Sequence, residues 1–103
     1  VIGDRAFEQR KFSPFRYDLA KAWFEFTGLP FVFAAWIANK KLPAEFISAF
    51  NEGNKIGLQN IEKVIAENQY ANYDLQKYYT ENISYLLTDK KREGLKKFLE
   101  FIV

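Results

Sequence analysis

The sequence contains no cysteine and no histidine. Without cysteine, the chain can form neither a disulfide framework nor a thiolate metal site. Without histidine, it lacks the general base and the metal ligand that proteins use most often. Both absences are compatible with a cytosolic protein, although neither of them proves that location.

Methionine is also absent, and the chain opens with Val1-Ile2-Gly3-Asp4, a sequence typical of the end of a buried strand. A natural open reading frame normally begins with methionine. We therefore expect these 103 residues to be a piece of a longer protein. The alternative is a numbering that omits only the starting methionine.

A strong charge of one sign and a long apolar run are missing as well. Fifteen basic residues stand against thirteen acidic ones, which is not the basic stripe of a nucleic-acid-binding protein. The longest apolar run, residues 29–38, is too short to cross a bilayer. We therefore expect neither a nucleic acid nor a membrane as a partner.

Apolar and aromatic side chains are abundant. Hydrophobic residues make up 49% of the chain, which has eleven phenylalanines, six tyrosines and two tryptophans. A chain of this length fits one small domain and buries roughly two-thirds of its unfolded surface. So many rings need partners to pack against, and helices alone do not readily supply them.

Cap and stop residues predict a short helix early in the chain. Asp18 can cap a helix over residues 19–26, because its carboxylate can accept hydrogen bonds from free N–H groups of the first turn. Gly28 suits a left-handed helix end, and Pro30 prevents the helix from continuing.

Three more helices are predicted in the second part of the chain. Apolar residues at intervals of three and four indicate a long helix over residues 43–67. Gly53 and Gly57 lie inside it, so we expect close packing or a bend there. Asp74 and Thr88 can cap the two helices that follow.

Residues 31–38 have no polar side chain and no helical stripe, and they are rich in aromatic and branched side chains. Such a segment predicts a strand that is buried on both faces. It needs neighbours on both edges for its backbone groups, and within the chain only Val1-Ile2 offers a second strand. The predicted fold class is therefore an α/β fragment, mostly helical with one or two strands, whose sheet is incomplete.

Three stretches together resemble the chorismate dehydratase (MqnA) family of menaquinone biosynthesis. The first is IGDRA at residues 2–6, and the second is YDLAKAW at 17–23, which leads into TGLPFVFAAW at 27–36. The third is YTENISY at 79–85, followed by GLKKFL at 94–99. The resemblance covers the whole chain but only the later part of a family member. A sister enzyme, dihydroxynaphthoate synthase, follows its TGLP with IPLG and has IHE in place of IGD.

The resemblance implies a two-lobed fold like that of type 2 periplasmic binding proteins, with the substrate in the cleft. Residues 1–28 would hold the end of a second-lobe strand and a helix near the hinge. Residues 29–103 would hold a returning strand and the C-terminal helices of the first lobe. The missing N-terminal portion, or a second copy of the chain, would then be needed to complete the sheet.

The implied activity is the loss of water from chorismate, a dicarboxylate, in the cytoplasm, without a metal or other cofactor. No glycine-rich phosphate loop is present. Because roughly half of the two-lobed cleft is absent, we expect the 103 residues alone to be inactive. Two alternatives remain: a solute-binding module of the same fold without catalysis, and the sister synthase.

Five residues are candidates for the site. Asp4, beside Gly3, can handle a proton or orient a substrate hydroxyl, or it can simply bond nearby N–H groups in a loop. Arg5 can hold a substrate carboxylate or form a surface ion pair. Thr27 can present its hydroxyl at the cleft edge or terminate a helix. Phe31 can pack on the substrate ring or belong to the core.

Overall fold

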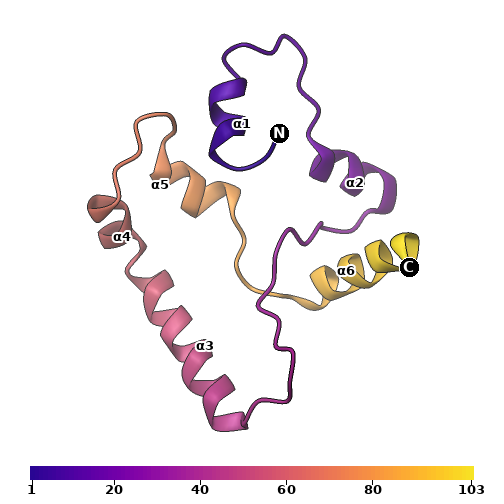
Figure 1. Cartoon of the computed structure of the whole chain (residues 1–103), viewed down its shortest axis with the longest axis vertical. Helices are drawn as coiled ribbons and strands as arrows, with labels where there is room; N and C mark the ends of the chain where they lie inside the picture. Colours follow the sequence, from indigo (N-terminus) through magenta and orange to yellow (C-terminus); the bar gives the residue numbers. More distant parts are fainter. The chain divides into compact units, whose positions relative to one another are not determined.

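The computed structural model describes all 103 residues, and its regular structure is entirely helical. The elements in chain order are α1 (Asp4–Gln9), α2 (Leu19–Thr27), α3 (Ala44–Gln59), α4 (Ile61–Glu67), α5 (Leu75–Lys77), the π-helix η1 (Tyr78–Asn82) and α6 (Asp89–Ile102). Figure 1 shows them along the chain, from indigo α1 to yellow α6. None of the helices combines the length and apolar character needed to span a bilayer.

The predicted strands are wrong for this chain. Residues 31–38 lie in neither a helix nor a strand, no backbone–backbone hydrogen bond is found for residues 31–35, and no residue of the chain is in a strand. A strand exists only where a neighbour pairs with it, and the chain supplies none. Val1-Ile2 is not a strand either, because the chain turns at once into α1, where the Ala6 N–H donates to the Gly3 carbonyl at 2.9 Å.

The predicted limits of α2 are confirmed to within one residue. One carboxylate oxygen of Asp18 accepts hydrogen bonds from the backbone N–H groups of Ala20 at 3.0 Å and Lys21 at 3.1 Å. At the other end, Gly28 has φ 71°, the left-handed conformation that a residue without Cβ adopts without strain. Its N–H donates to the Phe24 carbonyl at 2.8 Å and closes the helix.

The long helix predicted over residues 43–67 is present but is divided into α3 and α4 at Asn60. The Asn60 side-chain amide donates to the Ile56 carbonyl at 2.8 Å, while its backbone N–H turns to the Gly57 carbonyl at 3.1 Å. Asn54 makes the same side-chain bond to the Phe50 carbonyl within unbroken α3, so it is the turn of the Asn60 backbone N–H that marks the break. The division therefore lies at Asn60 and not at Gly53 or Gly57.

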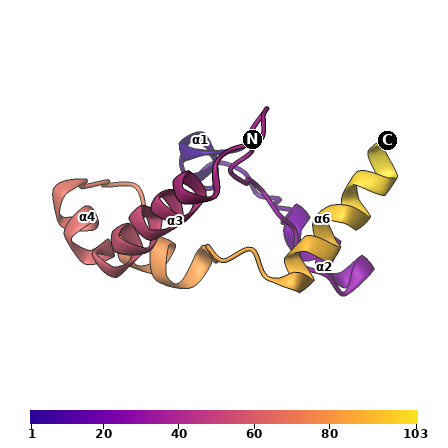
Figure 2. The ribbon, with the colours of Figure 1, turned by 90° about the horizontal axis from the view of Figure 1, so that it is seen from below.

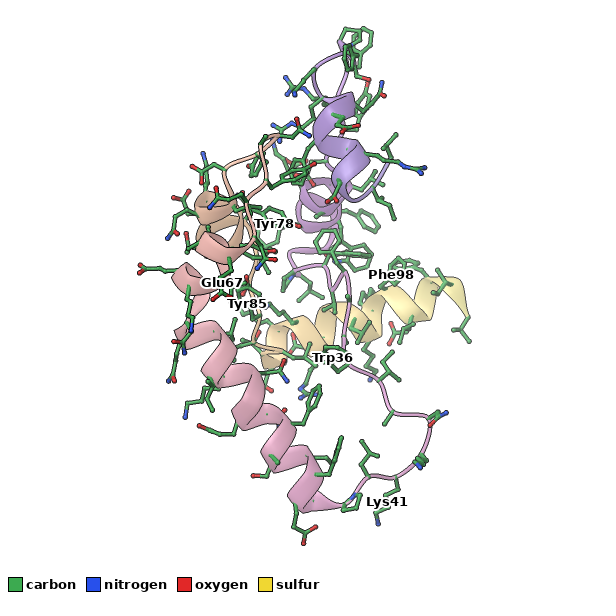
Figure 3. All side chains as sticks on the ribbon, turned by 60° about the vertical axis from the view of Figure 1, so that its left-hand side comes forward. Trp36, Lys41, Glu67, Tyr78, Tyr85 and Phe98 are labelled. Atoms are coloured by element: carbon green, nitrogen blue, oxygen red, sulfur yellow. The ribbon has the colours of Figure 1, made fainter.

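The caps of the last two helical segments are as predicted. Asp74 accepts a hydrogen bond from the Lys77 N–H at 3.1 Å, and Thr88 accepts one from the Lys91 N–H at 3.4 Å. The π-helical turn of η1 directly after α5 is not predicted, because nothing in the apolar spacing distinguishes it from an α-helix. Its closing hydrogen bond runs from the Ile83 N–H to the Tyr78 carbonyl. Figure 3 labels Tyr78 at the start of this turn.

The chain divides into two compact units: unit 1 comprises Val1–Trp36 with Tyr85–Val103, and unit 2 comprises Ile37–Ser84. No hydrophobic side chain is buried in either unit, and Gly94 of unit 1 is the one buried residue. Apolar side chains of residues 31–38 are open to solvent, with Phe33 79% and Trp36 82% exposed. The packing in unit 1 is mainly between aromatic rings that stay partly exposed.

Replacing Asp18 with alanine is expected to loosen the start of α2. The N–H groups of Ala20 and Lys21 lose their acceptor, which costs about 1 kcal/mol of helix stability. The backbone carbon chemical shifts of Leu19–Thr27 should move toward random-coil values in an NMR spectrum of the variant. Helix α6, whose Thr88 cap is intact, serves as the internal control. Unchanged α2 shifts would show that the cap contributes nothing.

Candidate functional site

Four rings from distant parts of the chain meet in unit 1 and are called here the Trp23 cluster: Trp23, Phe31, Phe98 and Phe101. The Trp23 ring lies edge-on to Phe31 at 5.9 Å, to Phe98 at 5.7 Å and to Phe101 at 6.2 Å between centroids. Phe31 and Phe98 are 5.0 Å apart. The cluster thus joins α2, the chain that follows it, and α6. Figure 2 shows α2 and α6 beside each other.

Edge-on ring pairs of this kind each contribute about 0.5–1.5 kcal/mol beyond their buried area. Two further pairs extend the cluster, Phe31 with Phe33 at 5.2 Å and Phe26 with Phe101 at 6.2 Å. The Trp23 Nε1 atom is buried without a hydrogen-bond partner. An unpaired buried donor costs about 1–3 kcal/mol, so the cluster holds together in spite of this group.

Gly94 brings the α6 backbone against the TGLP run. A Cβ at this position would collide with the Pro30 carbonyl oxygen, and it would lie 3.3 Å from the Pro30 carbonyl carbon and 3.6 Å from Leu29 Cβ. Only glycine allows this approach. The GLKKFL stretch at 94–99 and the TGLP stretch at 27–30, both part of the family resemblance, are therefore in direct contact.

The Thr27 hydroxyl is occupied by the backbone of its own turn. It donates to the Trp23 carbonyl at 2.8 Å and accepts from the Leu29 N–H at 3.1 Å. A hydroxyl has one donor and two acceptor positions, so one acceptor position remains. The helix-ending role of Thr27 is thus present in the structure, and the hydroxyl can still accept one hydrogen bond from a ligand.

Gly3, Asp4 and Arg5 are together at the start of α1 and are exposed. Gly3 has φ 67° and lies just before α1. Asp4 is the first residue of α1, where a negatively charged carboxylate interacts favourably with the helix dipole. Arg5 lines an open surface depression with Glu8 and Phe12 among its neighbours. The carboxylate and the guanidinium are therefore accessible to a ligand.

The five predicted site residues thus form two sets within unit 1. Thr27 and Phe31 are brought together through Trp23, by a hydrogen bond to its carbonyl and a contact with its ring. Gly3, Asp4 and Arg5 are consecutive at the start of α1. Their proposed roles toward a substrate remain predictions.

Two residues with defining contacts were not singled out from the sequence. In unit 2, the Tyr73 hydroxyl donates to Asn82 Oδ1 at 3.0 Å, and its ring meets that of Tyr78 at 5.9 Å. The tyrosines of this region therefore pack on one another, and the rings of Tyr78 and Tyr79 are 5.4 Å apart. The other residue is Gly94. A glycine inside an amphipathic helix costs about 1 kcal/mol of helix stability relative to alanine, and this cost was the sequence feature that could have drawn attention to it.

Groups of acidic side chains that could hold a metal ion are not found in the chain. The residues predicted for the site offer an accessible carboxylate, a guanidinium, backbone groups and an aromatic ring. Such groups can position an anionic aromatic or cyclic ligand and move a proton.

Comparison with known proteins places this arrangement in a family. A profile described as menaquinone biosynthesis matches residues 1–103. The chain is 34% identical to the chorismate dehydratase of Thermus thermophilus in an alignment of length 88 that covers 81% of this chain and 32% of the relative. It is 30% identical to the chorismate dehydratase of Campylobacter jejuni in an alignment of length 104 that covers 97% of this chain and 47% of the relative.

The chain thus spans about a third to a half of the length of these two relatives. No solved structure matches it. The residues in the Trp23 cluster and at the start of α1 all fall within the matched profile. The chain therefore belongs to the menaquinone biosynthesis family.

Proposed function

We propose that residues 1–103 are part of a chorismate dehydratase, which removes water from chorismate to give an enolpyruvyl-oxy benzoate in the futalosine route of menaquinone biosynthesis. The observation that carries the proposal is the name of the two relatives, each matching at least 81% of this chain. The family profile supports the pathway, and the relatives' names favour the dehydratase over the sister synthase.

The reaction is an elimination. A base removes a ring proton, the electron pair of that C–H bond forms a ring double bond, and the C–O bond of the ring hydroxyl breaks. The leaving oxygen takes up a proton and departs as water. Aromatisation makes this step favourable, so the enzyme chiefly positions the substrate and assists two proton movements. The reaction involves no change of oxidation state that would require a second substrate.

In this proposal, the accessible Asp4 carboxylate moves one of the two protons, and Arg5 holds a substrate carboxylate through its planar fork. Gly3 lets the chain turn so that both side chains stand at the start of α1. Thr27 accepts a hydrogen bond with its remaining acceptor position. Phe31 presents a ring edge from the Trp23 cluster to the substrate ring.

The proposal also includes the context of the whole enzyme. The two-lobed, periplasmic-binding-protein-like fold provides the cleft, and the part of the family protein that this chain does not span provides strands beside residues 31–38. The location implied by the resemblance is the cytoplasm. The exposed apolar side chains near the end of that segment support a need for further chain.

The experiment uses a joined enzyme, in which residues 1–103 replace the matching stretch of the Campylobacter jejuni chorismate dehydratase. We expect the joined enzyme to convert chorismate to the dehydrated product, detected by mass spectrometry. The 103-residue chain alone should show no turnover, because it lacks most of the cleft. The remainder of the relative alone is the matched control for background activity.

Three results would contradict the proposal. Turnover by the isolated chain would show that the rest of the cleft is not needed. Chorismate binding by the joined enzyme without product would favour the solute-binding alternative. Failure of the joined enzyme to bind chorismate at all, when the unmodified relative is active in the same assay, would remove chorismate as the substrate.

A further inference from the structure

One face of α6 holds the segment that ends α2. Gly94, Phe98 and Phe101 are spaced by four and three residues and therefore share a face of the helix. From that face, Gly94 meets the Pro30 carbonyl, and Phe98 meets the rings of Phe31 and Trp23. These contacts join residues more than sixty positions apart in the sequence.

We infer that α6 fixes the position of the 27–31 segment, and that Gly94 and Phe98 are positioning residues for the substrate contacts of that segment. The inference rests on the proposed function, in which Thr27 and Phe31 contact chorismate. Neither Gly94 nor Phe98 touches the substrate in this proposal. They act through Pro30 and Phe31.

The contacts from α6 are important for the position of residues 27–31 because few other interactions hold these residues. The Thr27 hydroxyl and the left-handed Gly28 fix the turn itself. After the turn, no backbone–backbone hydrogen bond is found for residues 31–35. The rings of Trp23 and Phe98 and the close approach of Gly94 therefore set where Phe31 lies relative to the end of α2.

Replacing Gly94 with alanine in the joined enzyme is expected to raise KM for chorismate about tenfold while kcat changes less than about twofold. The added Cβ displaces Pro30, and a contact made equally in the bound substrate and the transition state affects KM alone. A purely structural role would reduce the amount of active enzyme, which lowers the apparent kcat and leaves KM unchanged.

Gly57→Ala is the matched control, because it makes the same chemical change in α3, where a Cβ meets nothing within 4 Å. Its KM and kcat should equal those of the joined enzyme. Phe98→Leu is the second test variant and keeps the site apolar while removing the ring contacts to Phe31 and Trp23. It should also raise KM severalfold, and it decides the question if Gly94→Ala fails to fold.

A second readout is independent of activity. In the 103-residue chain with Trp36 replaced by phenylalanine, Trp23 gives the single indole N–H signal in a nitrogen–proton NMR spectrum. Gly94→Ala and Phe98→Leu should shift this signal while helical content by circular dichroism stays the same, and Gly57→Ala should leave it in place.

The two readouts separate the possible failures. If the joined enzyme does not convert chorismate, the proposed function fails, and the indole signal alone decides the positioning inference. An indole signal that neither test variant moves would overturn the inference. So would an active joined enzyme whose KM is unchanged in both Gly94→Ala and Phe98→Leu.

Discussion

Asp4→Asn in the joined enzyme is expected to lower kcat for chorismate dehydration by about 100- to 10,000-fold, the usual contribution of a positioned general acid or base. The amide keeps the size of the side chain but cannot take up or release the proton. Stability should change by no more than about 1 kcal/mol, the value of an exposed carboxylate at a helix start. Steady-state kinetics and thermal unfolding measure the two effects separately.

Asp89→Asn provides the matched control. Asp89 is also an exposed carboxylate at the first position of a helix, α6, so its loss costs a similar amount of helix stability. It has no role in the proposed reaction, and its kcat should be unchanged. Equal kcat values for Asp4→Asn and Asp89→Asn would remove Asp4 from the site, while leaving the family membership of the chain intact.

Residues 31–38 are expected to change from unprotected to strongly protected when the fold is completed. In the 103-residue chain no backbone–backbone hydrogen bond is found for residues 31–35, so their hydrogen exchange should be close to that of an unstructured peptide. In the joined enzyme, a strand paired on both edges should exchange at least about a thousandfold more slowly, because such amides open only with much of the structure. Hydrogen exchange followed by mass spectrometry measures both states.

The amides of α2 serve as the reference, since their hydrogen bonds exist in the chain as it stands. They should show protection in both samples. A segment 31–38 that stays unprotected in an active joined enzyme would show that it is a loop and not a strand of the sheet. Protection in the isolated chain that grows with its concentration would instead show that a second copy supplies the neighbouring strand.

Features that depend on neighbouring residues were predictable from the sequence. The caps at Asp18 and Thr88 and the stop at Gly28 each involve atoms within a few residues, so the local pattern contains the whole interaction. The division of α3 from α4 was less visible. There the Asn60 backbone N–H turns to the Gly57 carbonyl, and nothing in the apolar spacing indicates that change.

The strand over residues 31–38 illustrates the opposite case. Its apolar pattern is that of a buried strand, but a strand is a property of two paired segments, and the pattern describes only one of them. The chain leaves it without regular structure, and Trp36 is 82% exposed. The sequence therefore predicted the structure of the isolated segment wrongly, and the need for a partner strand stays a prediction.

The site shows the same limit. The proximity of Gly3, Asp4 and Arg5 was predictable because they are consecutive. Thr27 and Phe31 were candidates because they belong to the TGLPF stretch. The sequence did not reveal that Gly94 contacts Pro30, because that contact joins residues far apart in the chain. The sequence showed only that a glycine lies among the apolar residues of α6. The structure shows that this glycine allows the Pro30 backbone to approach the helix.

The most direct test of the proposed reaction follows the oxygen that leaves. Chorismate labelled with oxygen-18 in its ring hydroxyl is incubated with the joined enzyme, and the product and the solvent water are analysed by mass spectrometry. We predict an aromatic product that keeps the enolpyruvyl ether and has lost the label, with the label recovered in water. Release of pyruvate, a product that retains the label, or unchanged chorismate beside an active control would contradict the assignment as a chorismate dehydratase.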